Sequence, residues 1–160
     1  MTGAAVALSE LGSLIGRELG PSDPVLVDQA MVDLFAKTTG DRQWVHVDVD
    51  RAKVEMDGAI AHGYLILSLI PLYVSRLLDV ANVSNALNYG LERVRFLSPV
   101  RPPAMMTAIL CVRAVEEKGG GVLMRNDVTI SQAGAPKPAC VATTLTLLLP
   151  GEGRFGPFDI

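Results

Sequence analysis

The sequence predicts an α+β fold in which an antiparallel sheet wraps around one long buried helix. Residues 58–78 are apolar almost all round, which is typical of a helix that is buried on every side. After residue 79 the chain changes to segments rich in Val, Leu and Thr that short turns with Gly or Pro separate, which indicates consecutive antiparallel strands. Helices early and strands late are the order of an α+β domain.

The elements before the buried helix are a short strand, an amphipathic helix and a polar loop. The strand is expected at Val25–Val27, and Asp28 can cap a helix that ends at Gly40. In this helix the side chains expected to face the core recur at helical spacing, at Met31, Leu34, Phe35 and Thr38. From Asp41 to Asp57 the periodicity is lost, so we expect a polar loop with about one helical turn around 50–54.

The buried helix and the strands account for the rest of the chain. Pro71 lies inside the helix and predicts either a kink or a division into two shorter helices. Four strands are expected, at Asn85–Phe96, Ala104–Glu116, Val122–Ser131 and Ala139–Leu149. We therefore expect one domain over residues 1–160, with a core at about 25–149 and a C-terminal tail at 151–160.

Composition excludes several classes of protein. The 160 residues are 49% hydrophobic, with a net charge of −3 and no run of basic residues, so no nucleic-acid partner is expected. The mean hydropathy is +0.35, but polar residues interrupt the apolar stretch before it is long enough to span a membrane. Two isolated cysteines form no disulfide framework and no signal peptide is recognisable, so we expect a cytoplasmic protein.

The residues able to carry proton chemistry lie close together in the chain. The only two histidines, His46 and His62, fall within 22 residues of Asp41. Asp41 and His46 can act as a general acid–base pair, while Gly63 opens the buried helix, where free N–H groups can stabilise an oxyanion. On spacing alone, turn capping by Asp41 and close packing at Gly63 remain alternatives. The chain has no metal-ligand spacing of the HxxxH or CxxC type, so no metal is expected.

Two segments together resemble the MaoC-like (R)-specific enoyl-CoA hydratases of the hotdog superfamily. Residues 35–48 read FAKTTGDRQWVHVD and residues 60–64 read IAHGY. The family pattern is a helix ending in Gly-Asp, a His five residues after the Asp, an acidic residue two later, and Ala-His-Gly at the start of the central helix. The segments NYG at 88–90 and VRF at 94–96 resemble the branch that includes nodulation protein N and mycobacterial hydratases.

The resemblance implies a hotdog fold and a hydro-lyase of fatty acid metabolism that uses no cofactor. It implies that Asp41 and His46 hold and activate the water that is added to a trans-2-enoyl thioester, and that the Gly63 N–H binds the thioester carbonyl. Gln43 stands where the family usually has an Asn, and we expect substrate contacts from the side chains that surround the motif, namely Gln43, His62, Tyr64 and Ser68. The expected partners are an acyl-CoA substrate and a second copy of the chain in a homodimer that covers the open sheet edge.

Three other functions remain open at this point. The same site could act on a fatty acyl or polyketide intermediate bound to a carrier protein. A non-catalytic hotdog subunit that binds a thioester is a second alternative, although the retained Asp41, His46 and Gly63 argue against it. A thioesterase would more naturally place a carboxylate on the central helix, and residues 63–78 contain no Asp or Glu.

Overall fold

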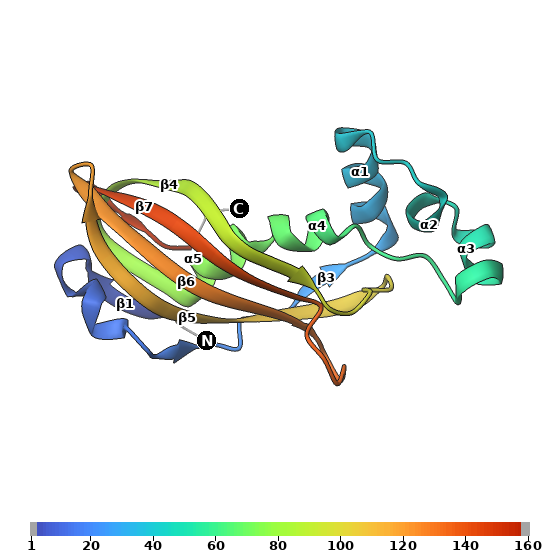
Figure 1. Ribbon diagram of the computed structural model, residues 1–160, viewed down its shortest axis with the longest axis horizontal. Helices are drawn as coiled ribbons and strands as arrows, with labels where there is room; N and C mark the ends of the chain where they lie inside the picture. The colour runs from blue at the N-terminus through green and yellow to red at the C-terminus, as the bar shows by residue number, and fades with distance from the viewer. Residues whose placement is uncertain (1–2, 158–160) are drawn as a thin grey trace.

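The computed structural model describes residues 3–157 and contains a seven-stranded sheet curved around two helices (Figure 1). The strand order is β1-β4-β7-β6-β5-β2, and β3 also pairs with β5. All pairs are antiparallel except β1 with β4. In chain order the elements are β1 (Ala4–Ala7), the 3-10 helix η1 (Leu8–Leu14), β2 (Glu18–Leu19), β3 (Val25–Val27), α1 (Gln29–Thr39), α2 (Trp44–Val47), α3 (Val49–Met56), α4 (Gly63–Ser68), α5 (Ile70–Leu77), β4 (Leu78–Phe96), β5 (Ala104–Lys118), β6 (Gly121–Gln132) and β7 (Cys140–Phe155).

Both predicted ends of α1 are confirmed. The Asp28 carboxylate accepts a hydrogen bond from the Met31 N–H at 2.9 Å, and Gly40 adopts a left-handed conformation with φ 82°. The predicted buried stripe was wrong at Leu34, which is 64% exposed, and at Thr38, which is also exposed. The helix buries Val32 instead. Leu34 is two positions after Val32, which corresponds to a rotation of roughly 200° about the helix axis, so the two side chains lie on opposite sides of the helix.

The expected polar loop after Gly40 contains two short helices. α2 carries His46, and α3 is capped by Asp48, whose carboxylate accepts from the Arg51 N–H. The prediction of a single turn was therefore wrong. Polar residues predominate in α3, so no long apolar stripe marked it in the sequence. Figure 1 shows α1, α2 and α3 projecting together beyond the end of the sheet.

The central apolar segment forms two helices, as the alternative reading of Pro71 predicted. α4 ends at Ser68, and α5 starts at Ile70 with Pro71 in its first turn, where the missing N–H costs no hydrogen bond. The segment is not buried on every side as predicted. Tyr64 and Ser68 are exposed, and they lie on one face of α4.

The four predicted long strands are present, and two of them are longer than expected. β4 begins at Leu78, directly after α5, and β7 continues to Phe155, which pairs with Val80. Part of the expected tail therefore belongs to the sheet, and residues 158–160 of that tail lie outside the described residues. Pro150, Gly151 and Gly153 obscure this extension in the sequence because they are typical of a loop.

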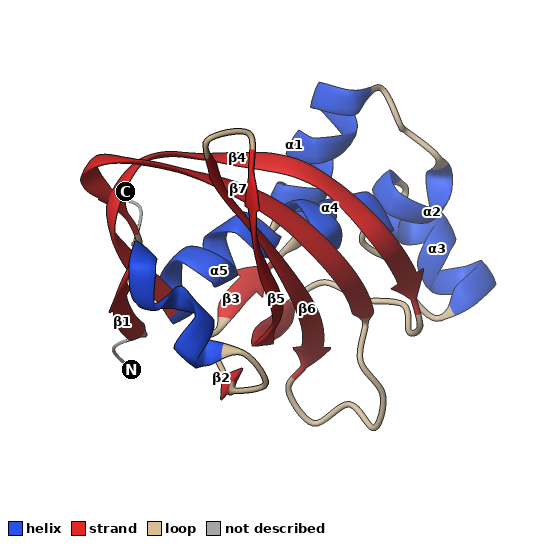
Figure 2. Ribbon diagram, turned by 60° about the vertical axis from the view of Figure 1, so that its left-hand side comes forward, coloured by secondary structure: helices blue, strands red, loops and turns tan. Residues whose placement is uncertain are grey.

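The core lies between the concave face of the sheet and helices α4 and α5 (Figure 2). Its largest fully buried side chains include Tyr73 of α5 and Met106, Leu110 and Met124 of the sheet, while Leu11 of η1 closes one end. Burial raises the pKa of the Tyr73 hydroxyl to about 12, and its hydroxyl donates to the Met106 carbonyl at 3.3 Å. This arrangement agrees with the expected hotdog fold. Within residues 3–157 no helix is long and apolar enough to cross a membrane.

Candidate active site

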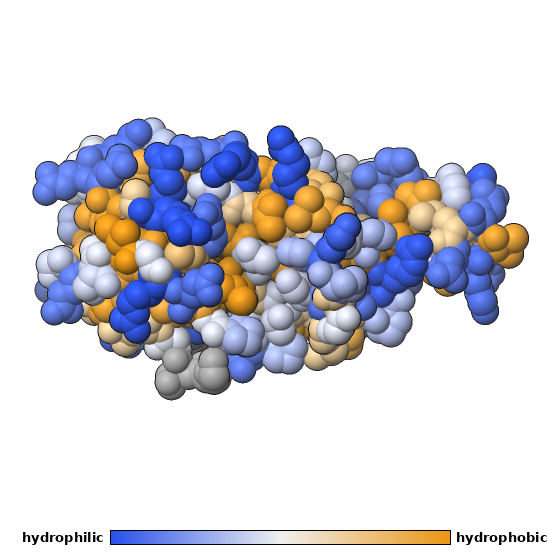
Figure 3. All heavy atoms as spheres, turned by 60° about the horizontal axis from the view of Figure 1, so that its bottom comes forward, coloured by the Kyte–Doolittle hydropathy of each residue, from blue (hydrophilic) through white to orange (hydrophobic). Residues whose placement is uncertain are grey.

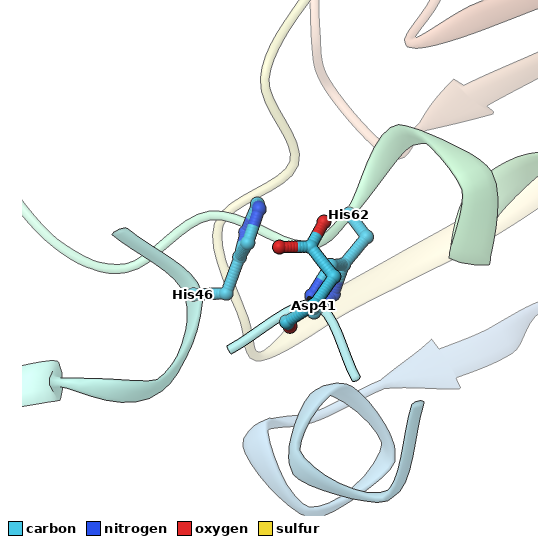
Figure 4. Close-up of side chains that lie close together, drawn as sticks. All are labelled: Asp41, His46 and His62. Atoms are coloured by element: carbon cyan, nitrogen blue, oxygen red, sulfur yellow. Dashed lines mark hydrogen bonds between the residues drawn. The ribbon is translucent and has the colours of Figure 1, made fainter. Parts of the chain in front are cut away.

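Three side chains from the two motif segments meet at the end of the sheet. Asp41 follows α1, His46 lies on α2 and His62 directly precedes α4. One side-chain ligand atom from each lies within 4.8 Å of the other two, and Figure 4 shows the Asp41 carboxylate directed toward the imidazole rings. Folding therefore brings together residues that are up to 21 positions apart in the chain.

A backbone carbonyl fixes the orientation and the tautomer of His46. Its Nδ1 lies 2.7 Å from the carbonyl oxygen of Ile60, which can only accept, so Nδ1 carries the proton. In the neutral ring Nε2 is then left with its lone pair. His46 is 8% exposed, and the Gln29 amide donates to its backbone carbonyl at 2.8 Å, which holds α2 against α1. Nε2 of His46 is therefore the basic atom of the site.

The Ile60 carbonyl is itself held in place by the backbone. The Ile60 N–H donates to the Val45 carbonyl at 3.0 Å, and the Ala61 N–H donates to the Val100 carbonyl at 2.8 Å. The first bond ties the segment before α4 to α2, and the second ties it to the loop that follows β4. The carbonyl that orients the His46 ring is thus held by backbone hydrogen bonds to two different parts of the chain.

His62 contacts both Asp41 and His46. Its Nε2 donates to the backbone carbonyl of Asp41 at 2.9 Å, and its ring stacks on His46 with centroids 3.7 Å apart. The His62 side chain is 2% exposed, and its ring centroid lies 5.1 Å from that of Phe35. The sequence assigned His62 to substrate binding, but this geometry favours a positioning role, since the ring holds Asp41 and His46 and scarcely reaches solvent.

Gln43 keeps the Asp41 carboxylate ionised. Its amide donates to the Asp41 carboxylate oxygen at 3.1 Å. Hydrogen bonding from Gln43 is the largest influence that lowers the pKa of Asp41, and the two nearby histidines lower it further. Asp41 is therefore a carboxylate, and a hydrogen-bond acceptor, at neutral pH. Gln43, like His62, contacts Asp41 in this arrangement.

The three side chains are close enough to be considered as ligands of a metal ion, but their orientation does not suit one. An imidazole lone pair lies in the ring plane, and the His46 and His62 rings are stacked with an angle of 27° between planes. Lone pairs of two such rings do not converge on one point. One nitrogen of each ring is also used by a carbonyl group. The expectation that the site holds no metal stays a prediction.

Gly63 lies at the wall of a cavity of about 260 Å³ that His46 also lines. Among the described residues no hydrogen bond is found for the N–H of Gly63 or of Tyr64, since these groups belong to the first turn of α4. A Cβ at Gly63 would lie 2.9 Å from Cδ2 of Phe96, so glycine is needed for this close approach. The cavity thus combines a base, a carboxylate nearby and a free N–H.

Tyr64 and Ser68 face a second, larger cavity of about 840 Å³ between α4, α5, β4 and β7. Tyr64 is 71% exposed at its edge, and the Ser68 hydroxyl donates to the Leu65 carbonyl at 2.7 Å. Phe96 lines the smaller cavity and makes an edge-to-face contact with Tyr64, with centroids 6.0 Å apart, so these two rings lie between the cavities. Tyr64 and Ser68 are therefore not brought into contact with Asp41 and His46.

Sequence reasoning missed three contributors to the site. These are the Gln29 amide, the Ile60 carbonyl and the Phe96 ring. A backbone carbonyl leaves no signal in the residue type, and Gln29 is an ordinary polar residue in the first turn of a helix. Phe96 was noted only as part of the VRF segment, and its contact with Gly63 depends on how β4 crosses α4.

Comparison with known proteins gives one consistent result. Residues 10–133 match the model of the MaoC like domain family. The chain is 38% identical over 141 residues to 3-hydroxyacyl-thioester dehydratase Z of Mycobacterium tuberculosis, an alignment that covers 87% of this chain and 93% of that protein. It is 37% identical over 158 residues to nodulation protein N of Rhizobium leguminosarum bv. viciae, covering 96% and 95%. Among solved structures, the R-hydratase of Pseudomonas aeruginosa superposes with a TM-score of 0.65 at 22% identity over 91% of this chain and 92% of that one, which supports the hotdog fold.

The contact between Gly63 and Phe96 gives a test of this packing. We expect Gly63→Ala to lower the free energy of unfolding, because its Cβ would displace the Phe96 ring. In a Phe96→Ala background the same change should cost little, and a coupling of about 0.5–3 kcal/mol should appear in a double-mutant cycle measured by urea denaturation. An equal cost of Gly63→Ala in both backgrounds would contradict the contact.

Proposed function

This chain belongs to the MaoC-like family of hotdog proteins and is a hydro-lyase. We propose that it hydrates a trans-2-enoyl-CoA thioester to the (R)-3-hydroxyacyl thioester, or catalyses the reverse dehydration. The relatives support dehydratase chemistry in general. The observation that carries the specific proposal is a cavity lined by His46 and by Gly63, whose N–H is unbonded, with the Asp41 carboxylate close to His46.

Water is held by two acceptors in this proposal. The Asp41 carboxylate and Nε2 of His46 each accept one hydrogen of the same water molecule, because Asp41 is ionised and the proton of the neutral His46 ring is on Nδ1. Imidazole is a stronger base than a carboxylate, so His46 takes the proton as the water oxygen attacks Cβ of the enoyl group. Asp41 keeps the oxygen in place and stabilises the imidazolium that forms.

The remaining steps return that proton and stabilise the charge. As the C–O bond forms at Cβ, the electron pair of the double bond moves toward the thioester carbonyl, and the Gly63 N–H donates to the carbonyl oxygen. The imidazolium of His46 then delivers its proton to Cα, which restores both the thioester and the neutral ring. The atoms of one water molecule are thus added, and the enzyme is unchanged.

The larger cavity is the proposed site of the acyl chain. It begins at Tyr64, the residue after Gly63, and follows α4 and α5 past Leu67, Ile70 and Val74. These side chains supply an apolar wall on the helix side. When the thioester carbonyl is bound at Gly63, the acyl chain can enter this cavity if the Phe96 ring, which lies between the two cavities, moves aside.

The central catalytic test uses variants of the acid–base pair. We expect Asp41→Asn and His46→Gln each to lower kcat/KM for crotonyl-CoA hydration by about 10²–10⁴-fold, because the first removes the negative charge that stabilises the imidazolium and the second removes the base that takes the proton of the water. The reaction is followed by the loss of the enoyl-thioester absorbance, and circular dichroism checks the fold. Asp50→Asn is the matched control, since Asp50 is an exposed carboxylate in the first turn of α3. Near-normal rates in either Asp41→Asn or His46→Gln would refute these roles.

We further propose that the active form is a homodimer joined along β4. β1 pairs with β4 only over Leu78–Ala81, and no other strand among residues 3–157 pairs with the rest of that edge. Along it Leu87, Tyr89 and Leu91 are each more than 40% exposed. An open apolar edge of this kind pairs readily with another strand. On the face shown in Figure 3 apolar groups also reach the surface, but they are interspersed with charged side chains.

Light scattering tests the dimer. We expect a mass about twice the 17.0 kDa of the chain, and we expect Leu87→Lys to shift it toward the monomer because charged side chains on an edge oppose pairing. Ile109→Lys is the control, as Ile109 is 38% exposed on β5, away from the open edge. A monomeric mass for the unaltered protein would rule the proposal out.

A further inference from the structure

The Phe96 ring lies at the boundary between the two cavities. Together with His46 and Gly63 it lines the smaller cavity, and the wall of the larger cavity includes Tyr64, the residue after Gly63. A Cβ at Gly63 would lie only 2.9 Å from Cδ2 of the ring, and the ring also makes an edge-to-face contact with Tyr64, with centroids 6.0 Å apart. The ring therefore packs against both residues where the two cavities adjoin.

The smaller cavity is too small to hold a long acyl chain by itself. Its volume of about 260 Å³ corresponds to about nine groups of the size of a water molecule, at about 30 Å³ each. A crotonyl thioester and the attacking water fit within that volume, whereas a dodecenoyl chain does not. The larger cavity, at about 840 Å³, is in the size range of small-molecule sites. A long chain that reacts in the smaller cavity therefore has to extend past the Phe96 ring into the larger one.

The backbone at Phe96 is fixed, but its side chain has room to turn. Phe96 is the last residue of β4 and pairs with Cys140 of β7, and the N–H of the next residue, Leu97, donates to the Ala139 carbonyl at 2.9 Å. The Phe96 side chain is 46% exposed, so one side of the ring faces solvent. Exposed side chains change rotamer within nanoseconds. A change of rotamer would open the way between the cavities without any movement of the sheet.

We propose that Phe96 determines the chain-length preference of this enzyme. Short enoyl thioesters are hydrated with the ring in place, whereas a long chain binds only after the ring has left Gly63 and Tyr64. This inference rests on the proposed function and deepens it by naming a specificity-determining residue, which takes no part in the proton transfers.

The contacts of the ring set the size of the effect. They are lost only when a long chain binds, so their free energy reduces the affinity for long chains and leaves that for short chains unchanged. An edge-to-face aromatic pair such as Phe96 with Tyr64 corresponds to a factor of about 2–10 in an equilibrium constant. Removal of the ring should therefore favour long chains over short ones by about this factor.

The test changes the size of this one side chain and compares two substrates. We measure kcat/KM for trans-2-dodecenoyl-CoA and for crotonyl-CoA and take their ratio. We expect Phe96→Ala to raise the ratio about 2–10-fold, Phe96→Leu to raise it less, and Phe96→Trp to lower it, because a larger ring is harder to displace. Leu97→Ala is the control, since Leu97 also lines the smaller cavity and is 50% exposed. It enlarges that cavity but leaves the Phe96 ring in place, so its ratio should be unchanged.

Three results would overturn the inference. The first is a ratio that stays the same in all three Phe96 variants, which would mean that the chain does not pass the ring. The second is a ratio that falls in Phe96→Ala, which would make the ring a support for long chains. The third is an equal rise in Leu97→Ala, which would assign the effect to cavity size. If the unaltered enzyme hydrates neither thioester, the proposed function has failed, and the same comparison is then made with the dissociation constants of the saturated thioesters dodecanoyl-CoA and butyryl-CoA.

Discussion

The site depends on the hydrogen bond between the Ile60 carbonyl and Nδ1 of His46. This bond fixes the ring against rotation and leaves Nε2 as the basic atom beside the Asp41 carboxylate. The carbonyl can do this because backbone hydrogen bonds hold its segment to Val45 and Val100, which lie on different parts of the chain. His62 completes the support from the other side by bonding to the Asp41 carbonyl and stacking on His46. Main-chain geometry, more than side-chain contacts, therefore sets the positions of the two acceptors that the proposed mechanism needs.

The start of α4 links this acid–base pair to the proposed acyl site. Gly63 lines the smaller cavity, while Tyr64, the next residue, lines the larger one. The Phe96 ring packs on Gly63 and separates the two spaces. In the proposed function, the reacting carbonyl lies between the polar site on the projecting helices and the larger cavity under the sheet.

Local signals predicted those parts of the fold that local interactions determine. Asp28 and Gly40 marked both ends of α1 because a capping carboxylate and a left-handed glycine act within a few residues. Asp41, His46 and Gly63 were predicted from two motif segments and the family that these resemble; the structure places Asp41 and His46 close together, and the catalytic roles stay a proposal. Leu34 was misplaced because tertiary packing selects a different face of α1. α2 was missed, and α3 was predicted only as one turn around residues 50–54, because such short helices depend on their neighbours rather than on an apolar stripe. The contacts of His62 with Asp41 and His46 arise from tertiary packing, which residue spacing does not reveal.

Nitrogen-15 NMR of the histidine side chains tests the central claim most directly. With only two histidines in the chain, His62→Phe simplifies the spectrum and assigns the signals of His46. At a pH where His46 is neutral, our account requires a protonated Nδ1 with the shift of a hydrogen-bonded N–H, and an unprotonated Nε2. A proton on Nε2 of neutral His46 would place the lone pair toward Ile60, remove the base from the site and contradict the account.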